Sequence, residues 1–237
     1  MNREYYFYRY LCPKEVISKK KVLYGDYSDG GYVLLDDLTN IKIAYSFGIS
    51  NIISFDKALA DKEIDVYMYD HTTKALPFEN PKFHFKKIGL AGGQKKDYNL
   101  KRLNELLIEN KHTQEKNMIL KIDIENNEWD VLNEISDDIL NQFKYIAMEF
   151  HIWNINKDYS LYLNCLKHLT KFHQIFHIHC CNCKDLLIIG DNPICDTIEV
   201  SYIKKEGNEF KKDETTYPVK GFDFKKLVLE NQIWIWN

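Results

Sequence analysis

The chain alternates short runs of β-branched and aromatic residues with longer segments in which apolar residues recur at helical spacing. The short runs predict seven strands, over residues 41–49, 65–71, 83–90, 118–124, 145–151, 174–179 and 197–203. The helical pattern is found in residues 54–61, 100–110, 128–135 and 160–172. Such alternation is typical of βαβ units, so we predict an α/β fold with a mostly parallel sheet and helices on both faces.

The pattern changes after residue 174. Residues 183–192 predict a hairpin-like excursion before the last strand, with no long helix between the two final strands. Strands joined without a helical crossover pair antiparallel, so one antiparallel strand is expected at the C-terminal side of the sheet. We expect residues 1–40 to form an N-terminal cap on the same domain as residues 41–237.

The composition favours one globular domain and disfavours nucleic-acid-binding, membrane-spanning and disulfide-rich secreted proteins. The 237 residues are 45% hydrophobic and 28% charged, which is ordinary for one globular domain. The formal net charge of −3 arises from scattered residues and forms no basic surface for nucleic acid. No apolar stretch is long enough for a membrane span, the N-terminus lacks a signal-peptide core, and the six cysteines lack disulfide-framework spacing. We expect a cytoplasmic monomer or homodimer.

The first candidate site is the turn after the first strand, which contains Gly48, Ser50 and Asn51. Glycine lets the backbone approach a ligand closely, and a helix N-terminus follows the turn. Only one glycine is present, so the fingerprint of phosphate-bearing dinucleotides is absent. Taken alone, Gly48 is more often a plain turn glycine.

Asp70 ends the second strand, about twenty residues beyond that glycine, and His71 follows it. A carboxylate at this place can accept hydrogen bonds from both hydroxyls of a ribose. The alternative is that Asp70 caps the following segment, as aspartate often does at strand ends. Together with the glycine turn, Asp70 predicts a nucleoside ligand.

The fourth predicted strand carries Lys121, Asp123 and Glu125 at alternate positions, and hence on one face. Burying unpaired charges costs several kcal/mol. These side chains should therefore lie at the carboxyl edge of the sheet, facing a cleft and pairing with one another or with a ligand. A solvated edge strand is the alternative.

The fifth and sixth strands bring further candidates to the same edge. Glu149 and His151 share one face at the end of the fifth strand, and His179 closes the sixth. Histidine titrates near working pH, so His151 is the first choice for a general base, oriented by Asp123, Glu149 or His179, and His179 is the second. The same four residues could bind a divalent metal, but a metal-free role is favoured.

The motifs together resemble those of FkbM-type S-adenosylmethionine-dependent methyltransferases, over roughly residues 24 to 204. In order, the matching segments are Asp29-Gly-Gly-Tyr-Val33, Tyr45-Ser-Phe-Gly48, Tyr69-Asp70-His-Thr72, Leu120-Lys-Ile-Asp-Ile-Glu125 with Glu128-Trp129, Glu149-Phe-His-Ile-Trp153 and Phe176-His-Ile-His179. The resemblance implies a Rossmann-like class I methyltransferase fold. It implies that the Gly48 turn, with Ser50 and Asn51, binds S-adenosylmethionine together with Asp70 and His71, and that Asp123 and Glu125 lie beside the methyl donor.

Members of this family mostly methylate hydroxyl oxygens. The resemblance therefore implies O-methylation of a sugar, a polysaccharide precursor or a related small metabolite. The chain departs from the family pattern at Ser50 and Asn126, where glycines are usual, and at Ile52, where an acid is usual. Two alternatives remain open: a nucleotide-sugar or NAD-type oxidoreductase, and a non-catalytic module that binds S-adenosylmethionine.

Overall fold

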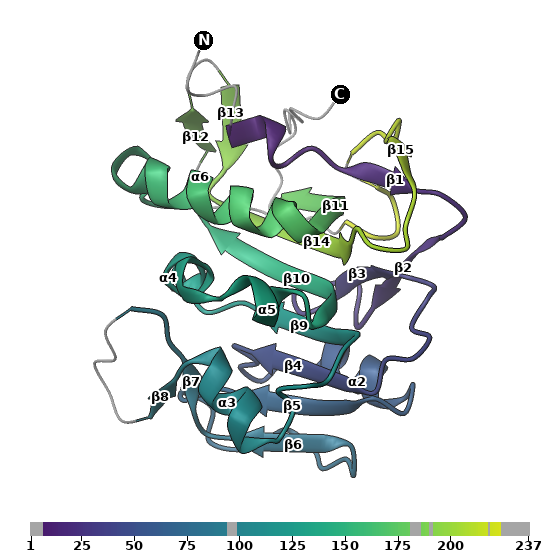
Figure 1. The fold of residues 1–237 in the computed structure, drawn as a ribbon, viewed down its shortest axis with the longest axis vertical. Helices are drawn as coiled ribbons and strands as arrows, with labels where there is room; N and C mark the ends of the chain where they lie inside the picture. Colours follow the sequence, from purple (N-terminus) through teal and green to yellow (C-terminus); the bar gives the residue numbers. More distant parts are fainter. Residues whose placement is uncertain (1–6, 94–98, 181–185, 190–191, 218, 224–237) are drawn as a thin grey trace.

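A central seven-stranded sheet organises the protein in a computed structural model that describes residues 7–93, 99–180, 186–189, 192–217 and 219–223. The strand order is β11-β14-β10-β9-β4-β5-β6 (Figure 1). In chain order these strands are β4 (Ile43–Phe47), β5 (Asp65–Tyr69), β6 (Phe83–Lys86), β9 (Met118–Ile122), β10 (Phe143–His151), β11 (His173–Cys180) and β14 (Thr197–Lys204). All seven predicted strands are confirmed. The third ends early, and its last residues form the separate strand β7 (Gly89–Leu90), which pairs with β8 (Leu100–Lys101).

The strand directions match the prediction. β4 is parallel to β5 and β9, β6 is parallel to β5, and β10 is parallel to β9. β14 runs antiparallel to both β10 and β11. A mostly parallel sheet with this one antiparallel strand next to its edge is the Rossmann-like class I methyltransferase fold. The fold class predicted from the sequence is therefore confirmed.

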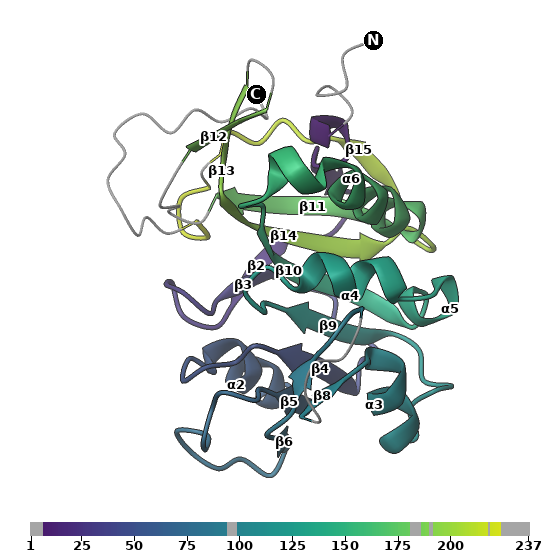
Figure 2. The same cartoon turned by 90° about the vertical axis from the view of Figure 1, so that its left-hand side faces the viewer.

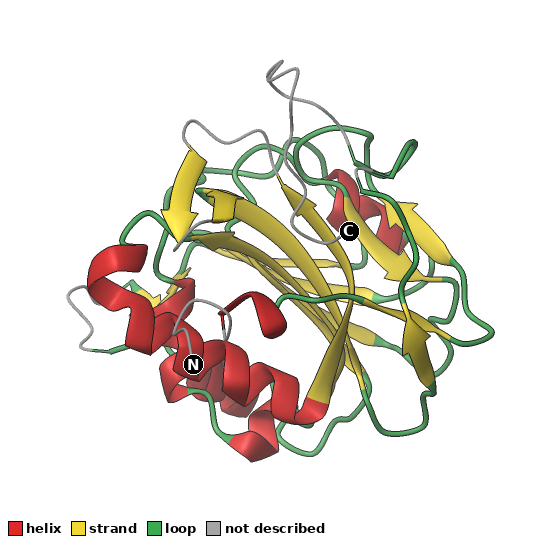
Figure 3. Ribbon diagram, turned by 90° about the horizontal axis from the view of Figure 1, so that it is seen from above, coloured by secondary structure: helices red, strands yellow, loops and turns green. Residues whose placement is uncertain are grey.

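Helices cover both faces of the sheet, with more of them on one side (Figure 3). The larger hydrophobic core lies against α3 (Leu103–Glu109), α4 (Glu128–Glu134), α5 (Asp137–Leu140) and α6 (Ile155–Phe172). On the opposite face, α2 (Ser54–Ala60) packs beside the hairpin of β2 (Lys21–Tyr24) and β3 (Tyr32–Leu35).

The four predicted helices are present, with shifted bounds. α3 begins at Leu103 because the two residues Leu100–Lys101 pair as a strand, and α6 begins at Ile155 rather than at residue 160. The short helix α5 was not predicted. It is a single turn whose first residues are capped by the Ser136 side chain, too short to show apolar periodicity.

The predicted excursion after β11 is partly described. β12 (Leu186–Ile189) and β13 (Asn192–Cys195) form an antiparallel hairpin at the β11 end of the sheet (Figure 2). Residues 183–185 and 190–191 of that prediction lie outside the described residues. At the N-terminal side, β1 (Lys14–Val16) pairs with β15 (Phe210–Lys212). Within the described ranges, no helix has the length and apolarity that a membrane crossing needs.

His173, at the start of β11, makes the fold sensitive to pH. Its ring is fully buried and its Nε2 lies 2.9 Å from the carbonyl oxygen of Phe143, so the neutral ring donates there. Burial lowers the pKa of His173 to about 4, against a reference value of 6.5. The unfolded chain binds this proton below pH 6.5 and the folded chain only near pH 4. Stability is therefore lost as the pH falls through that window, by on the order of 3 kcal/mol.

We expect His173→Gln to remove most of this dependence, because glutamine can still donate a hydrogen bond but does not titrate. The measurement is the free energy of unfolding by urea at pH 7 and pH 4.5, for the native protein and the variant. The variant should lose clearly less stability on acidification. An equal loss in both proteins would assign the pH dependence to other groups.

Candidate functional site

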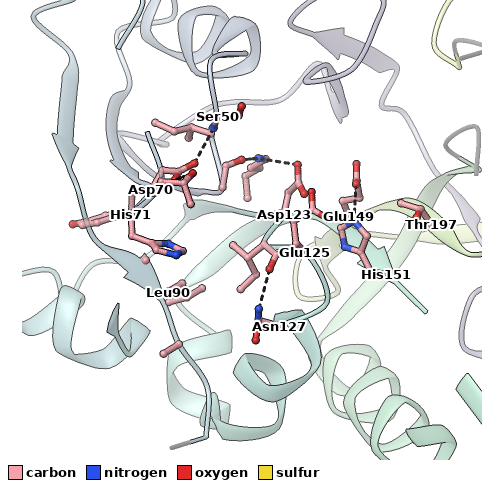
Figure 4. A pocket seen from close by; sticks show the side chains of 18 of the residues that line it. Ser50, Asp70, His71, Leu90, Asp123, Glu125, Asn127, Glu149, His151 and Thr197 are labelled. Atoms are coloured by element: carbon pink, nitrogen blue, oxygen red, sulfur yellow. Dashed lines mark hydrogen bonds and ion pairs between the residues drawn. The ribbon is translucent and has the colours of Figure 1, made fainter. Parts of the chain in front are cut away.

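A cavity of about 830 Å³ opens at the carboxyl ends of the parallel strands. In Figure 4, Ser50, Asp70 and His71 lie on one side of it, and Asp123, Glu149 and His151 lie on the other. Eight of the ten residues predicted for the site line this cavity: Gly48, Ser50, Asp70, His71, Asp123, Glu125, Glu149 and His151. The other two, Asn51 and His179, are not among its lining residues.

Gly48 is required by a close approach between two loops. Its φ is +71°, and a Cβ atom added there would lie 1.5 Å from the carbonyl oxygen of Asp123. Its backbone nitrogen also donates to the carbonyl oxygen of Tyr69, at 3.1 Å. The glycine therefore lets the turn after β4 lie directly against the loop after β9, so it is more than a plain turn residue.

The departures at Ser50 and Asn126 keep a glycine-like backbone. Ser50 has a φ of 47° and Asn126 has a φ of 74°, both in the left-handed region. Asparagine tolerates this region better than most residues, while serine is strained there. Both positions therefore have a backbone conformation that glycine adopts without strain.

Asp70 joins the two loops on the other side of the cavity. Its Oδ2 accepts from Ser50 N at 2.9 Å, and its Oδ1 accepts from Thr72 N, Thr72 Oγ1 and Thr73 N at 2.7, 2.6 and 3.1 Å. Burial alone would raise the pKa of Asp70, but these hydrogen bonds outweigh it and lower the pKa to about 2.

Asp70 thus caps the following segment, as the alternative interpretation holds. A carboxylate oxygen offers about two lone pairs. Oδ1 is saturated, and Oδ2 can accept one further donor. Asp70 Oδ2 thus has room for a ribose hydroxyl, and contact with both hydroxyls stays a prediction.

An apolar wall beside Asp70 was not predicted. Leu90, the last residue of β7, and Ala91, which follows it, are 5% and 7% exposed and line the cavity together with Gly92 and His71. A Cβ atom on Gly92 would lie 2.1 Å from the backbone of Asp130, so this glycine lets the wall lie close to α4. The signal in the sequence is an apolar pair followed by two glycines after the third strand, and it is weak without the fold.

Lys121 and Asp123 confirm the expected pairing of charges at the edge of the sheet. The Nζ atom of Lys121, which is 5% exposed, donates to the carbonyl oxygens of Phe47 and Gly48 at 3.2 and 2.6 Å. It also lies 3.4 Å from Asp123 Oδ2, which accepts from the Tyr32 hydroxyl at 3.3 Å. These contacts fix the Asp123 carboxylate directly after the C-terminal end of β9.

His151 lies between carboxylates on both sides of its ring. Its Nδ1 is 2.9 Å from Glu128 Oε1, and its Nε2 is 3.1 Å from Glu149 Oε1 and 3.6 Å from Glu125 Oε2. Burial alone would lower the pKa of His151, but its interactions with Glu128 and Glu149 raise it above the usual range. A raised pKa favours the protonated ring, so these contacts make His151 less suited to accept a proton than its predicted role as general base requires.

Glu149 is better suited to accept a proton. Burial raises its pKa, the hydrogen bond with His151 opposes that shift, and the neighbouring carboxylates of Asp123 and Glu199 add to it. A carboxylate with a raised pKa is a stronger base than an exposed one. Glu149 was predicted to orient the base, and its raised pKa makes it a candidate for the base itself.

His179 does not join the predicted four-residue metal set. It is buried, and its Nδ1 lies 3.5 Å from Glu199 Oε2 rather than beside Asp123. The atoms that the structure brings together belong to Asp123, Glu125 and His151, whose potential ligand atoms all lie within 4.8 Å of one another. Among the residues described, Glu125 thus takes the place expected for His179.

No protein-family model and no curated protein match the chain. Among solved structures it is similar to a chain described as "Putative hemolysin from Streptococcus thermophilus", with 12% identity over 75% of this chain and 72% of that chain and a TM-score of 0.37. It is also similar to a mutant 16S rRNA (adenine(1408)-N(1))-methyltransferase from Catenulisporales acidiphilia, with 11% identity over 78% of this chain and 97% of that chain and a TM-score of 0.34. At such low scores the likeness says nothing about chemistry.

Proposed function

We propose that this protein is an S-adenosylmethionine-dependent methyltransferase of the FkbM type, which transfers a methyl group to a hydroxyl oxygen of a sugar, a polysaccharide precursor or a related small metabolite. The observation that carries the proposal is one cavity in which the Gly48 turn, Asp70 and Asp123 meet at the carboxyl edge of the sheet. Ligands bind at this edge in open α/β folds. We place the protein in the cytoplasm, with residues 1–40 capping the same domain.

Three parts of the cavity suit the cofactor. The free acceptor capacity of Asp70 Oδ2 suits one ribose hydroxyl, and the apolar wall of Leu90 and Ala91 suits the face of the adenine ring. Asp123 and Glu125 supply negative charge toward the positively charged end of the methyl donor.

The acceptor side of the cavity favours a neutral substrate. Carboxylates from several elements face it, and they would repel a phosphorylated sugar. These acidic lining residues are Asp29, Asp123, Glu125, Asp130, Glu149, Asp196 and Glu199. Methyl transfer needs mainly alignment of the acceptor oxygen, the methyl carbon and the leaving sulfur, together with loss of one proton. In our proposal, Glu149 accepts that proton.

The test follows label from methyl-labelled S-adenosylmethionine into a panel of neutral sugars and polyols. We expect transfer to at least one acceptor and formation of the demethylated cofactor. Glu149→Gln should lower turnover by about 100-fold or more while cofactor binding stays unchanged. Glu134→Gln, an exposed acid on α4, is the matched control and should turn over normally. Transfer to none of the acceptors by a protein that binds the cofactor would contradict catalysis.

A further inference from the structure

We propose that the cavity also binds a divalent transition-metal ion through Asp123, Glu125 and the Nε2 of His151, which releases its proton to solvent when the ion binds. The inference deepens the proposed function, and rests on it only for what the ion does during catalysis. The three side chains come from the loop after β9 and from the end of β10, and Figure 4 shows them gathered on one side of the cavity.

The spacing of the ligand atoms suits an ion. Atoms of Asp123, Glu125 and His151 lie within 4.8 Å of one another. Neighbouring ligands of an ion bound at about 2.1 Å lie roughly 3 to 3.5 Å apart. His151 Nε2 already lies 3.6 Å from Glu125 Oε2, so this pair needs little movement to close on an ion. The Glu125 side chain is 76% exposed and can make this movement, while the buried ring of His151 stays fixed.

A buried carboxylate holds the His151 ring in the orientation that a metal ligand needs. Glu128 is fully buried, and its Oε1 lies 2.9 Å from His151 Nδ1. The same oxygen accepts from Ile124 N and Asn126 N, at 3.0 and 3.2 Å. Metal-binding histidines usually donate their second ring nitrogen to a carboxylate in this way, which leaves Nε2 directed at the ion.

A second, independent observation comes from β14. Glu199 is the register partner of Glu149 on the neighbouring strand, and both line the cavity. Its side chain is only 9% exposed, and its Oε1 is buried without a hydrogen-bond partner among the described residues. Two carboxylates directly opposite one another destabilise a sheet unless a cation lies nearby.

The nearest lysine cannot supply that charge. Lys121 Nζ donates to the carbonyl oxygens of Phe47 and Gly48 and lies 3.4 Å from Asp123 Oδ2, so its charge is already engaged by these groups. The ring of His151 carries at most one positive charge among Glu125, Glu128 and Glu149. A bound divalent ion would balance this excess of negative charge.

The donor set indicates the kind of ion. Imidazole favours first-row transition ions, and carboxylates are compatible with Mn²⁺, whereas Ca²⁺ and Mg²⁺ prefer oxygen ligands alone. We therefore expect Mn²⁺ or a similar ion to bind more tightly than Mg²⁺ or Ca²⁺. Such an ion next to the acceptor would lower the pKa of the hydroxyl that is methylated.

The experiment titrates Mn²⁺ into the full-length protein, freed of metal by a chelator, and follows the loss of the free-ion signal by electron paramagnetic resonance. We expect one saturable site per chain. Glu125→Gln and Asp123→Asn should each weaken Mn²⁺ binding by about 10-fold or more, and Glu128→Gln should weaken it by about 10- to 100-fold. Asp61→Asn, an exposed change on the other face, should have no effect.

Circular dichroism of each variant checks that the fold is intact. If the substitutions of buried residues unfold the chain, Glu125→Gln still tests the site, because the Glu125 side chain is exposed. Absence of saturable Mn²⁺ binding, or binding that Glu125→Gln leaves unchanged in a folded protein, would overturn the inference. Binding of S-adenosylmethionine is measured separately without Mn²⁺. Cofactor binding without metal binding refutes the ion site alone, and metal binding without cofactor binding refutes the proposed function alone.

Discussion

Gly48→Ala is expected to lower the free energy of unfolding by about 3 to 5 kcal/mol, the sum of left-handed strain and a steric clash. The added Cβ atom would lie 1.5 Å from the carbonyl oxygen of Asp123, a backbone atom that cannot rotate away. Relief requires the turn after β4 to separate from the loop after β9, which opens the cavity where the cofactor is proposed to bind. Urea denaturation followed by circular dichroism measures the loss.

Gly207→Ala is the matched control. Its φ of +77° is similar, but a Cβ atom there meets nothing within 4 Å. We expect a loss of about 1 kcal/mol, from backbone strain alone. The difference between the two variants isolates the close approach at Gly48. Equal losses would mean that the turn after β4 and the loop after β9 are not in close contact in the folded protein.

Glu128→Ala is expected to lower the free energy of unfolding by about 3 to 5 kcal/mol, as for other buried pairs that lose one partner. The substitution removes the carboxylate that pairs with His151 Nδ1, and it leaves the partly buried backbone donors Ile124 N and Asn126 N without their acceptor. Because the loop after β9 carries Asp123 and Glu125, the cavity should also lose its shape. The measurement is again urea denaturation.

Glu134→Ala, on the same helix α4, separates this effect from a general change in the helix. Glu134 is partly exposed and pairs with Arg102 Nε at 2.9 Å. Surface pairs of this kind contribute about 0 to 1 kcal/mol, so the control should remain close to the native protein. If Glu128→Ala also lowers the free energy of unfolding only slightly, the pair between Glu128 and His151 contributes little to the stability of the fold.

The fold could be predicted from the sequence because most strands of its central sheet are largely buried and its helices have periodic apolar faces. Seven strands and four helices follow from these patterns, and the antiparallel β14 follows from the missing helix before it. The single-turn helix α5 and the pairing of Leu100–Lys101 could not be predicted. Both depend on contacts formed only after the sheet has assembled, and neither leaves a periodic pattern.

The candidate site was predicted less completely. Alternation along β9 and β10 correctly brought Asp123, Glu125, Glu149 and His151 to one edge, because strand periodicity fixes their direction. The same reasoning assigned His151 as a base, since the sequence does not show that Glu128, from the following helix, pairs with its ring. Long-range pairs decide protonation, and single-sequence patterns do not contain them.

Binding of S-adenosylmethionine and of its demethylated product, by isothermal titration calorimetry, tests the central claim most directly. We predict one saturable site per chain for both ligands. Asp70→Asn should weaken that binding by about 10-fold or more, since a charged acceptor makes the stronger hydrogen bond to a ribose hydroxyl. Asp61→Asn should bind like the native protein. If neither ligand binds to the folded native chain, the methyltransferase assignment is wrong.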